Sequence, residues 1–175
     1  NFYLNETLLK KNLSQILKEY FGYDSFRGKQ EEIIKRIVEE KKHSLVLMPT
    51  GSGKSLCYQI PALCFNNITI IISPLIALMQ DQVDVLRKKN IPAAFINSTL
   101  SKQEREKRLE QFVSGKIKLL YVTPERFRKP DFIEQIRKVK IDLLAVDEAH
   151  CISEWGHDFR PDYSRIGEFR ELMGN

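Results

Sequence analysis

The stretch Leu45-Val-Leu-Met-Pro-Thr-Gly-Ser-Gly-Lys-Ser55 decides the expected fold, because an apolar run leads directly into a glycine loop that ends in lysine and serine. Gly51 and Gly53 permit backbone torsions that aim successive N–H groups inward, and the start of a following helix adds its positive end. Such a loop forms a cradle for phosphate oxygens. Residues 48–55 therefore predict a phosphate loop between a buried strand and a helix.

Each residue of the loop has an expected role in holding ATP and Mg²⁺. Lys54 can reach the β and γ phosphates, and the Ser55 hydroxyl suits Mg²⁺, a hard ion that prefers oxygen ligands. The usual pattern opens with glycine, where this chain has Met48. A glycine turn that merely caps a helix is the alternative, but it leaves Lys54 and Ser55 unexplained. The expected phosphate-binding residues are Thr50, Gly51, Ser52, Gly53, Lys54 and Ser55.

Short apolar runs alternate with amphipathic stretches along the rest of the chain. The spacing of apolar residues predicts helices over residues 9–20, 33–38, 54–64, 76–86 and 101–113. It predicts buried strands at residues 45–48, 68–72, 93–96, 119–122 and 143–146. Uninterrupted Val/Ile/Leu strands between helices are typical of a mainly parallel sheet covered on both faces. The expected fold class is therefore a doubly wound α/β domain.

Composition agrees with one ordinary globular domain. Of the 175 residues, 42% are hydrophobic and 29% are charged, far from the values of disordered or fibrous chains. A net charge of +5 leans only weakly toward a polyanionic partner. Three cysteines without a Cys-x-x-Cys pair favour buried thiols in a reducing compartment over disulfides or zinc. We see no signal peptide and no membrane span, so we expect a soluble intracellular protein.

Two acidic residues follow the last predicted strand. Residues 143–146 would deliver Asp147 and Glu148 to the carboxyl edge of the sheet, where open α/β folds bind ligands. We expect Asp147 to hold Mg²⁺ through water and Glu148 to polarise the water that attacks the γ phosphate. The alternative is a strand that simply ends in a polar turn.

Beyond these motifs, the chain resembles the RecQ family of DNA helicases. The segment Phe21-Gly-Tyr-Asp-Ser-Phe-Arg-Gly-Lys-Gln30 is similar to one that precedes the phosphate loop in that family. The resemblance implies that Tyr23 and Arg27 sandwich the adenine while Gln30 bonds its edge. An aromatic ring and a guanidinium plane can both stack on a purine, and an amide both donates and accepts. The family often has proline where this chain has Gly28.

Further stretches extend the resemblance toward DNA. Ser73-Pro-Leu-Ile-Ala-Leu-Met-Gln-Asp-Gln82, Asn97-Ser-Thr-Leu-Ser101 and Tyr121-Val-Thr-Pro-Glu-Arg126 are similar to family segments that meet the DNA backbone. The implied contacts come from Pro74, Thr99 and Thr123. Strand ends and helix caps are the structural alternative for these segments. The other basic residues between positions 102 and 140 are interleaved with acids, which favours a solvated face.

The stretch Ala149-His-Cys-Ile-Ser-Glu-Trp-Gly-His-Asp-Phe-Arg-Pro-Asp-Tyr163 resembles the aromatic-rich loop that couples single-stranded DNA to ATP hydrolysis in RecQ proteins. Trp155 and Phe159 offer faces on which bases stack at roughly 1 to 3 kcal/mol each, and Arg160 adds a phosphate or stacking contact. A packed cap is the alternative for Phe159 and Tyr163. For His150 the alternative is a capping or hydrogen-bonded histidine, because no second histidine stands nearby at metal-ligand spacing.

The resemblance implies an ATP-dependent 3′ to 5′ DNA helicase of repair and recombination, which couples Mg-ATP hydrolysis to movement along single strands and to duplex unwinding. We expect residues 1–175 to form the first RecA-like domain, with helices and the adenine segment in residues 1–40 and the phosphate-loop core in residues 41–175. Expected partners are single-stranded and partly duplex DNA and a second RecA-like domain, with no membrane. The expected location is the cytoplasm and nucleoid of a bacterium or the nucleus of a eukaryote.

The chain ends before any second α/β domain or arginine finger, so we expect the piece alone to hydrolyse ATP poorly. Loss of an arginine finger costs about 10³ to 10⁵ in rate. Two rival functions remain open at this point. One is an RNA helicase or remodelling ATPase, which shares the phosphate loop and acidic pair, and the other is a nucleotide-dependent binding module without turnover.

Overall fold

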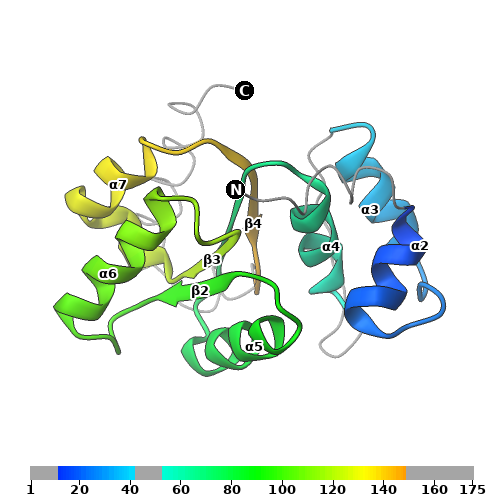
Figure 1. Cartoon of the computed structure of the whole chain (residues 1–175), viewed down its shortest axis with the longest axis horizontal. Helices are drawn as coiled ribbons and strands as arrows, with labels where there is room; N and C mark the ends of the chain where they lie inside the picture. The colour runs from blue at the N-terminus through cyan, green and yellow to red at the C-terminus, as the bar shows by residue number, and fades with distance from the viewer. Residues whose placement is uncertain (1–11, 42–52, 149–175) are drawn as a thin grey trace. The chain divides into compact units, whose positions relative to one another are not determined.

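The computed structural model describes residues 12–41 and 53–148, in two compact units that span residues 1–67 and 68–175 (Figure 1). The boundary between the units follows the helix after the phosphate loop, so Gly53, Lys54 and Ser55 belong to the first unit together with the N-terminal helices. The expected division at residue 40 stays a prediction. Among the described residues, no helix has the length and apolar character needed to cross a bilayer.

The described part of the first unit begins with an α-helix that continues as a π-helix. Asn12 starts α2 (Leu13–Ile16) through a capping box, in which Asn12 Oδ1 accepts from Gln15 N at 2.9 Å and Gln15 Oε1 accepts from Asn12 N at 3.0 Å. The chain continues as the π-helix η1 (Leu17–Phe21) and ends at Gly22. Gly22 has a φ of 74°, in the left-handed region that favours glycine.

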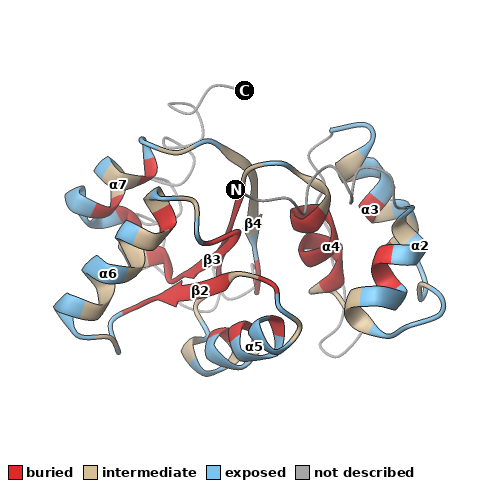
Figure 2. Cartoon of the chain, viewed as in Figure 1, coloured by how far each residue is buried: buried red, intermediate tan, exposed pale blue. Residues whose placement is uncertain are grey.

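Two further helices form the core of this unit. The helix α3 (Gln30–Val38) packs against α4 (Leu56–Cys64), and Ile34 is completely buried. Residues 56–63 of α4 are all buried, which explains why this helix is apolar on every side (Figure 2). The predicted helix over residues 54–64 is confirmed, with its start two residues later.

Residues 68–148 of the second unit contain a four-stranded sheet in the order β2-β3-β1-β4, and every pairing among these strands is parallel. The strands are β1 (Ile68–Ile72), β2 (Ala93–Ile96), β3 (Leu119–Val122) and β4 (Ile141–Val146). The first three coincide with the predicted strands. Together with the flanking helices they confirm the doubly wound α/β class.

Four helical segments accompany this sheet: α5 (Ile76–Lys88), α6 (Lys102–Val113), the 3-10 helix η2 (Pro124–Arg128) and α7 (Pro130–Ile136). The buried face of α5 carries Met79, Val83 and Leu86, as their spacing predicts. Ser101 caps α6 by accepting from Glu104 N at 3.2 Å. Phe112 of α6 and Phe132 of α7 join Ile70 and neighbouring strand residues in one apolar core (Figure 2).

Two features of this unit differ from the expectation. The strand β4 was expected to be buried, yet residues 141–145 are only half-buried and Val146 is 39% exposed. A physical reason is that β4 has a single strand neighbour, β1, within the described part of the sheet. The helical segments η2 and α7 were not predicted, because each is short and shows little helical periodicity.

Candidate functional site

The segment expected to bind adenine follows the left-handed turn at Gly22. Lys18 Nζ lies 2.8 Å from Asp24 Oδ1, and this hydrogen-bonded ion pair ties the turn back to η1 while it raises the pKa of Lys18. Tyr23 is 48% exposed, and the guanidinium carbon of Arg27 lies 5.8 Å from its ring centroid. A base stacked between two groups needs about 7 to 8 Å, twice a normal carbon contact. Tyr23 and Arg27 must therefore separate slightly to admit one.

Gln30 connects this segment to the phosphate loop. Its side chain is buried, its Oε1 accepts from Arg27 N at 2.8 Å, and its Nε2 donates to the Gly53 carbonyl at 3.0 Å. Gly53 has a φ of +77°, and a Cβ there would lie well under 3.0 Å from Gln30 Nε2. Two features at Gly53, its torsion and this close approach, therefore require glycine.

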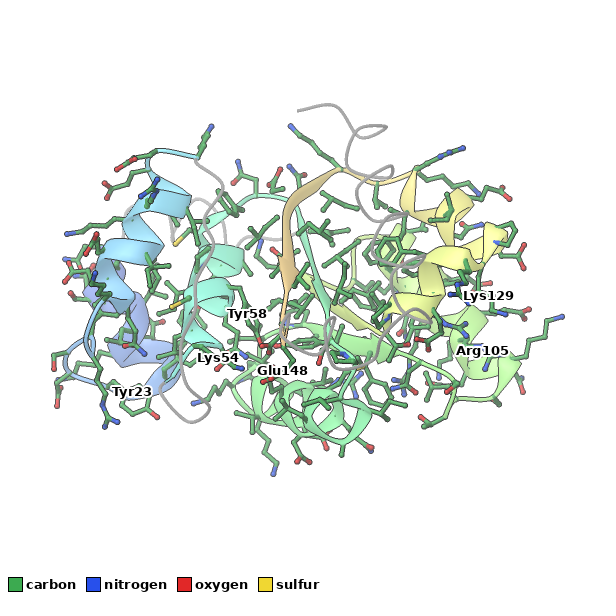
Figure 3. The ribbon with its side chains drawn as sticks, turned by 180° about the vertical axis from the view of Figure 1, so that it is seen from behind. Tyr23, Lys54, Tyr58, Arg105, Lys129 and Glu148 are labelled. Carbon is green, nitrogen blue, oxygen red and sulfur yellow. The ribbon has the colours of Figure 1, made fainter. Side chains whose placement is uncertain are left out.

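The described end of the phosphate loop leads into α4. Lys54 lies at the start of α4 (Figure 3), and both Lys54 and Ser55 are half-buried. Ser55 precedes the helix without a capping hydrogen bond from its side chain. The Ser55 hydroxyl is therefore not used to cap α4, which fits its expected role as a metal ligand. Thr50, Gly51 and Ser52 lie outside the described residues, as does the predicted strand at residues 45–48.

A row of polar residues lies at the carboxyl edge of the sheet in the second unit. The register pairs Val122 with both Ile72 and Ile96, and Ile72 with Val146, so the four strands end level. The next residue of each strand is polar and buried. In the order of the sheet these residues are Asn97, Thr123, Ser73 and Asp147.

Each member of this row shapes the turn that follows it. Ser73 Oγ accepts from Leu75 N at 3.3 Å, and Asn97 Oδ1 accepts from Thr99 N at 3.0 Å. The Thr123 hydroxyl donates to Glu125 Oε1, and Asp147 Oδ1 accepts from Glu148 N at 2.8 Å. Short side-chain bonds of this kind fix loop backbones that leave a sheet. Ser73 and Asn97 were not among the predicted site residues, although each is a polar residue directly after an apolar strand.

The acidic pair has the position that the sequence predicts. Asp147 N donates to Ile72 O at 2.8 Å, which extends the β1–β4 ladder by one residue. Both carboxylate residues are buried, and Glu148 has a φ of 53°. A left-handed torsion is uncommon for glutamate, and the bond from its own N–H to Asp147 supports it. The pair is therefore held in one orientation beside the end of β1.

The carboxylates at this edge are possible ligands of Mg²⁺. Within residues 12–41 and 53–148, no group of three or more His, Cys, Asp or Glu residues gathers to form a metal cage. Magnesium ordinarily keeps several waters and takes only one or two carboxylates besides substrate phosphates. The buried carboxylate of Asp147 therefore suits this ion chemically.

The residues expected to contact DNA divide into two groups. Pro74, Thr99 and Thr123 all lie at the carboxyl edge of the sheet, and among them only Thr99 is exposed. The Thr99 hydroxyl donates to Asn97 Oδ1 at 2.5 Å, and the Thr123 hydroxyl donates to Glu125. Trp155, Phe159 and Arg160 lie outside the described residues.

Known proteins resemble this chain along most of its length. The family described as DEAD/DEAH box helicase matches residues 27–173. The ATP-dependent DNA helicase RecQ of Bacillus subtilis is 53% identical over 158 residues, which cover 90% of this chain and 27% of that protein. The RecQ helicase of Haemophilus influenzae is 48% identical over 94% of this chain and 26% of its own length. The rat ATP-dependent DNA helicase Q5 is 45% identical over 95% of this chain and 18% of its own length.

These likenesses confirm the resemblance to RecQ helicases that the motifs indicated. The chain spans between about a sixth and about a third of the length of the curated relatives it matches. The family match covers well over half of the chain, including the segment expected to bind adenine from Arg27 onward, the phosphate loop and the acidic pair. The chain belongs to the DEAD/DEAH box helicase family.

Proposed function

We propose that this chain is the ATP-binding motor domain of a RecQ-type DNA helicase, in which ATP hydrolysis drives 3′ to 5′ movement along single-stranded DNA and the unwinding of duplex. The observation that carries the proposal is the Gln30 side chain, which joins the segment of Tyr23 and Arg27 to Gly53 of the phosphate loop. One side chain thus links a stacking site to a phosphate site, as an adenine nucleotide requires. The RecQ relatives at 48% and 53% identity support the choice of DNA.

In the first unit, one set of residues is proposed to bind the adenine and another set to bind the phosphates. Tyr23 and Arg27 stack on the two faces of the adenine, and the second N–H of the Gln30 amide is left for its edge. Thr50, Gly51, Ser52 and Gly53 cradle the phosphates with their N–H groups, and Lys54 carries the positive charge to the β and γ phosphates.

The acidic pair Asp147 and Glu148 has two proposed roles in ATP hydrolysis, metal binding and proton transfer. Ser55 and Asp147 are the proposed ligands of Mg²⁺, and bound Mg²⁺ would neutralise charge on the phosphate oxygens. The Glu148 carboxylate accepts a proton from the attacking water. Its fixed left-handed backbone limits the directions in which that carboxylate can point.

The remaining proposals concern partners. Pro74, Thr99 and Thr123 lie along a DNA strand, and Trp155, Phe159 and Arg160 supply stacking and phosphate contacts. A second RecA-like domain supplies the arginine finger, and the chain alone hydrolyses ATP poorly. The complete helicase acts on the nucleoid in the bacterial cytoplasm, or in the nucleus of a eukaryote.

The test is DNA-stimulated ATP turnover in a protein that joins this chain to a second RecA-like domain. Glu148→Gln should lower turnover by about 10² to 10⁴ while nucleotide binding persists. Absence of turnover in the unmutated protein would identify a nucleotide-dependent binding module instead, and turnover unchanged by Glu148→Gln would count against Glu148 as the general base. Equal or greater stimulation by RNA than by single-stranded DNA would identify an RNA helicase or remodelling ATPase.

Two further variants separate the two binding functions. Lys54→Ala should abolish nucleotide binding, because it removes the charge that faces the β and γ phosphates. Trp155→Ala should retain ATP affinity and lose DNA stimulation, because base stacking couples the strand to turnover. Retained DNA stimulation in the Trp155 variant would count against its stacking role.

A further inference from the structure

The residue proposed to stack on adenine, Tyr23, lies in an irregular segment between two helices. Residues 22–29 separate η1 from α3, and Tyr23 is exposed at the surface of the first unit (Figure 3). Among the described residues, none makes a backbone–backbone hydrogen bond to residues 23–26. A segment without such bonds can adopt several conformations, and ordering it around a ligand costs conformational entropy.

Both chain neighbours of Tyr23 are bonded to Lys18. The Lys18 carbonyl accepts from Gly22 N at 3.0 Å, and the Lys18 ammonium donates to Asp24 Oδ1 at 2.8 Å. Within residues 12–41 and 53–148, the second of these bonds is the one hydrogen bond that residues 23–26 make. One residue of the π-helix η1 therefore holds the chain on both sides of Tyr23.

The Lys18–Asp24 bond depends on the turn rather than on helical spacing. The two residues are six positions apart, whereas side chains that meet on one helix face are three or four apart. The pair forms because Gly22, with its left-handed φ of 74°, reverses the chain after η1. A Cβ added at Gly22 would meet nothing within 4 Å, so neighbouring side chains do not confine this turn. The Lys18–Asp24 bond is the contact that restrains it.

The other stacking group is anchored to a different helix. Arg27 N donates to Oε1 of Gln30, a buried residue of α3, at 2.8 Å. The guanidinium carbon of Arg27 lies 5.8 Å from the Tyr23 ring centroid. Breaking the Lys18–Asp24 bond would therefore release Tyr23 while Arg27 stays in place, and the two stacking groups would no longer be held opposite each other.

We propose that Lys18 is a positioning residue for adenine, whose bond to Asp24 holds the Tyr23 ring opposite Arg27 before the nucleotide binds. The inference rests on the proposed function and deepens it, because it names a residue outside the segment Phe21–Gln30 that acts through Tyr23 rather than by contact with the nucleotide. The side chains of Lys18 and Asp24 are 73% and 84% exposed, so the effect on affinity should be modest.

The test is isothermal titration calorimetry of the 175-residue chain with ATP and with inorganic tripolyphosphate, which lacks the base. Lys18→Met and Asp24→Ala each break the pair, and each should weaken ATP binding about threefold while tripolyphosphate binding is unchanged. The two substitutions change the net charge in opposite directions. A charge effect alone would strengthen anion binding in Asp24→Ala, so a loss of ATP affinity in both variants reports the bond itself.

Two comparisons show whether the pair acts as a unit. The double variant should bind ATP about threefold more weakly than the wild type rather than about ninefold, because either substitution alone already breaks the bond. Lys18→Arg keeps a charged donor and should retain most of the wild-type ATP affinity.

Lys35→Met is the matched control, because it removes the same charge from another exposed pair of the first unit. In that pair Lys35 Nζ lies 2.8 Å from Glu31 Oε1. This variant should bind both ligands as the wild type does. Circular dichroism establishes that every variant is folded.

Tyr23→Ala separates the inference from the proposed function. Loss of stacking should cost about tenfold in ATP affinity and leave tripolyphosphate binding unchanged. If Tyr23→Ala binds ATP as the wild type does, or if the folded wild-type chain binds no ATP, the proposed function is contradicted and the inference falls with it.

Where Tyr23→Ala does show its loss, three results would overturn the inference alone. These are unchanged ATP affinity in Lys18→Met and Asp24→Ala, an equal loss of tripolyphosphate affinity in the same two variants, or an equal loss of ATP affinity in Lys35→Met. The proposed helicase function would stand in each of these cases.

Discussion

Gln30 Nε2 donates to the carbonyl oxygen of Gly53 at 3.0 Å, across a separation of 23 residues in the chain. The other end of the same amide accepts from Arg27 N at 2.8 Å. A base that forms a hydrogen bond with the Gln30 amide would therefore affect the bond from Gln30 to Gly53, the residue directly before Lys54. This one side chain joins the segment proposed to bind adenine to Gly53 of the phosphate loop.

The first prediction concerns the donor in this link. Gln30→Glu keeps an acceptor for Arg27 N but replaces the donor to Gly53 O with a charged oxygen that repels it. We expect ATP affinity, measured with a fluorescent ATP analogue, to fall by roughly tenfold or more, since a buried acceptor loses its partner. The matched control is Gln15→Glu, because a glutamate serves the capping box of Asn12 equally well. Equal ATP affinity in the two variants would contradict the role of Gln30.

The second prediction uses two glycines with nearly the same backbone. Gly53 and Gly22 have φ values of +77° and +74°, so alanine costs about 1 to 2 kcal/mol of torsional strain at either position. A Cβ at Gly22 meets nothing within 4 Å, whereas a Cβ at Gly53 displaces the Gln30 amide. The free energy of unfolding, measured in urea, should therefore fall by about 1 kcal/mol more for Gly53→Ala. Identical losses would mean that the Gln30 contact adds nothing to stability.

The third prediction concerns the pH dependence of α6. A hydrogen bond from Arg108 holds the pKa of Glu104 below its usual 4.5. A lowered pKa in the folded state means that this contribution to stability is present above the usual pKa and disappears as pH falls through the lowered one. Glu104→Gln should therefore lower the thermal midpoint near neutral pH and have little effect in acid.

The control for this effect is Glu106→Gln, which removes the same charge from an exposed pair with Lys102 at 3.8 Å. A longer and more exposed pair contributes less, so its effect on the thermal midpoint should be smaller. A midpoint difference for Glu104→Gln that stays constant down to acid pH would show that the Arg108 bond does not stabilise the folded state.

Part of this architecture could be predicted from the sequence because its signals are local. The strands Ile68–Ile72 and Ala93–Ile96 are short apolar runs flanked by polar residues, and both appear with the expected bounds. The acidic pair follows from its place after an apolar run. The helices η2 and α7 were missed, although each begins with proline, a residue that favours the first turn of a helix.

The rest depends on contacts between residues far apart in the chain. Nothing local shows that Gln30 reaches Gly53, or that the hydroxyl protons of Thr99 and Thr123 are already used inside the protein. The contact that Arg108 makes could not be predicted either, because the sequence does not distinguish Arg108 from the other charged residues of the same polar helix. In the structure its guanidinium lies over the Phe95 ring, 4.5 Å from the centroid.

The last prediction follows from how arginines cover the end strand of the described sheet. The Pro92 carbonyl faces β3, where it accepts from Leu119 N at 3.2 Å, so the alternate carbonyls of Ala93 and Phe95 face away. Arg87 Nε donates to Ala93 O at 2.8 Å, and Arg108 Nη1 donates to Phe95 O at 2.8 Å. Exposed strand edges invite pairing with another chain, and these two bonds occupy the acceptors that such pairing needs.

Replacing Arg87 and Arg108 together with methionine keeps much of their apolar packing and removes both donors. We expect the double variant to self-associate as its concentration rises, measured by sedimentation velocity, while the wild type does not. Arg137→Met loses the same kind of charge away from β2 and should behave like the wild type. Because lower net charge also promotes association, the comparison should include the pair Arg36→Met and Arg137→Met, which matches the charge change. Equal association of the two double variants would assign the effect to charge rather than to the uncovered carbonyls of β2.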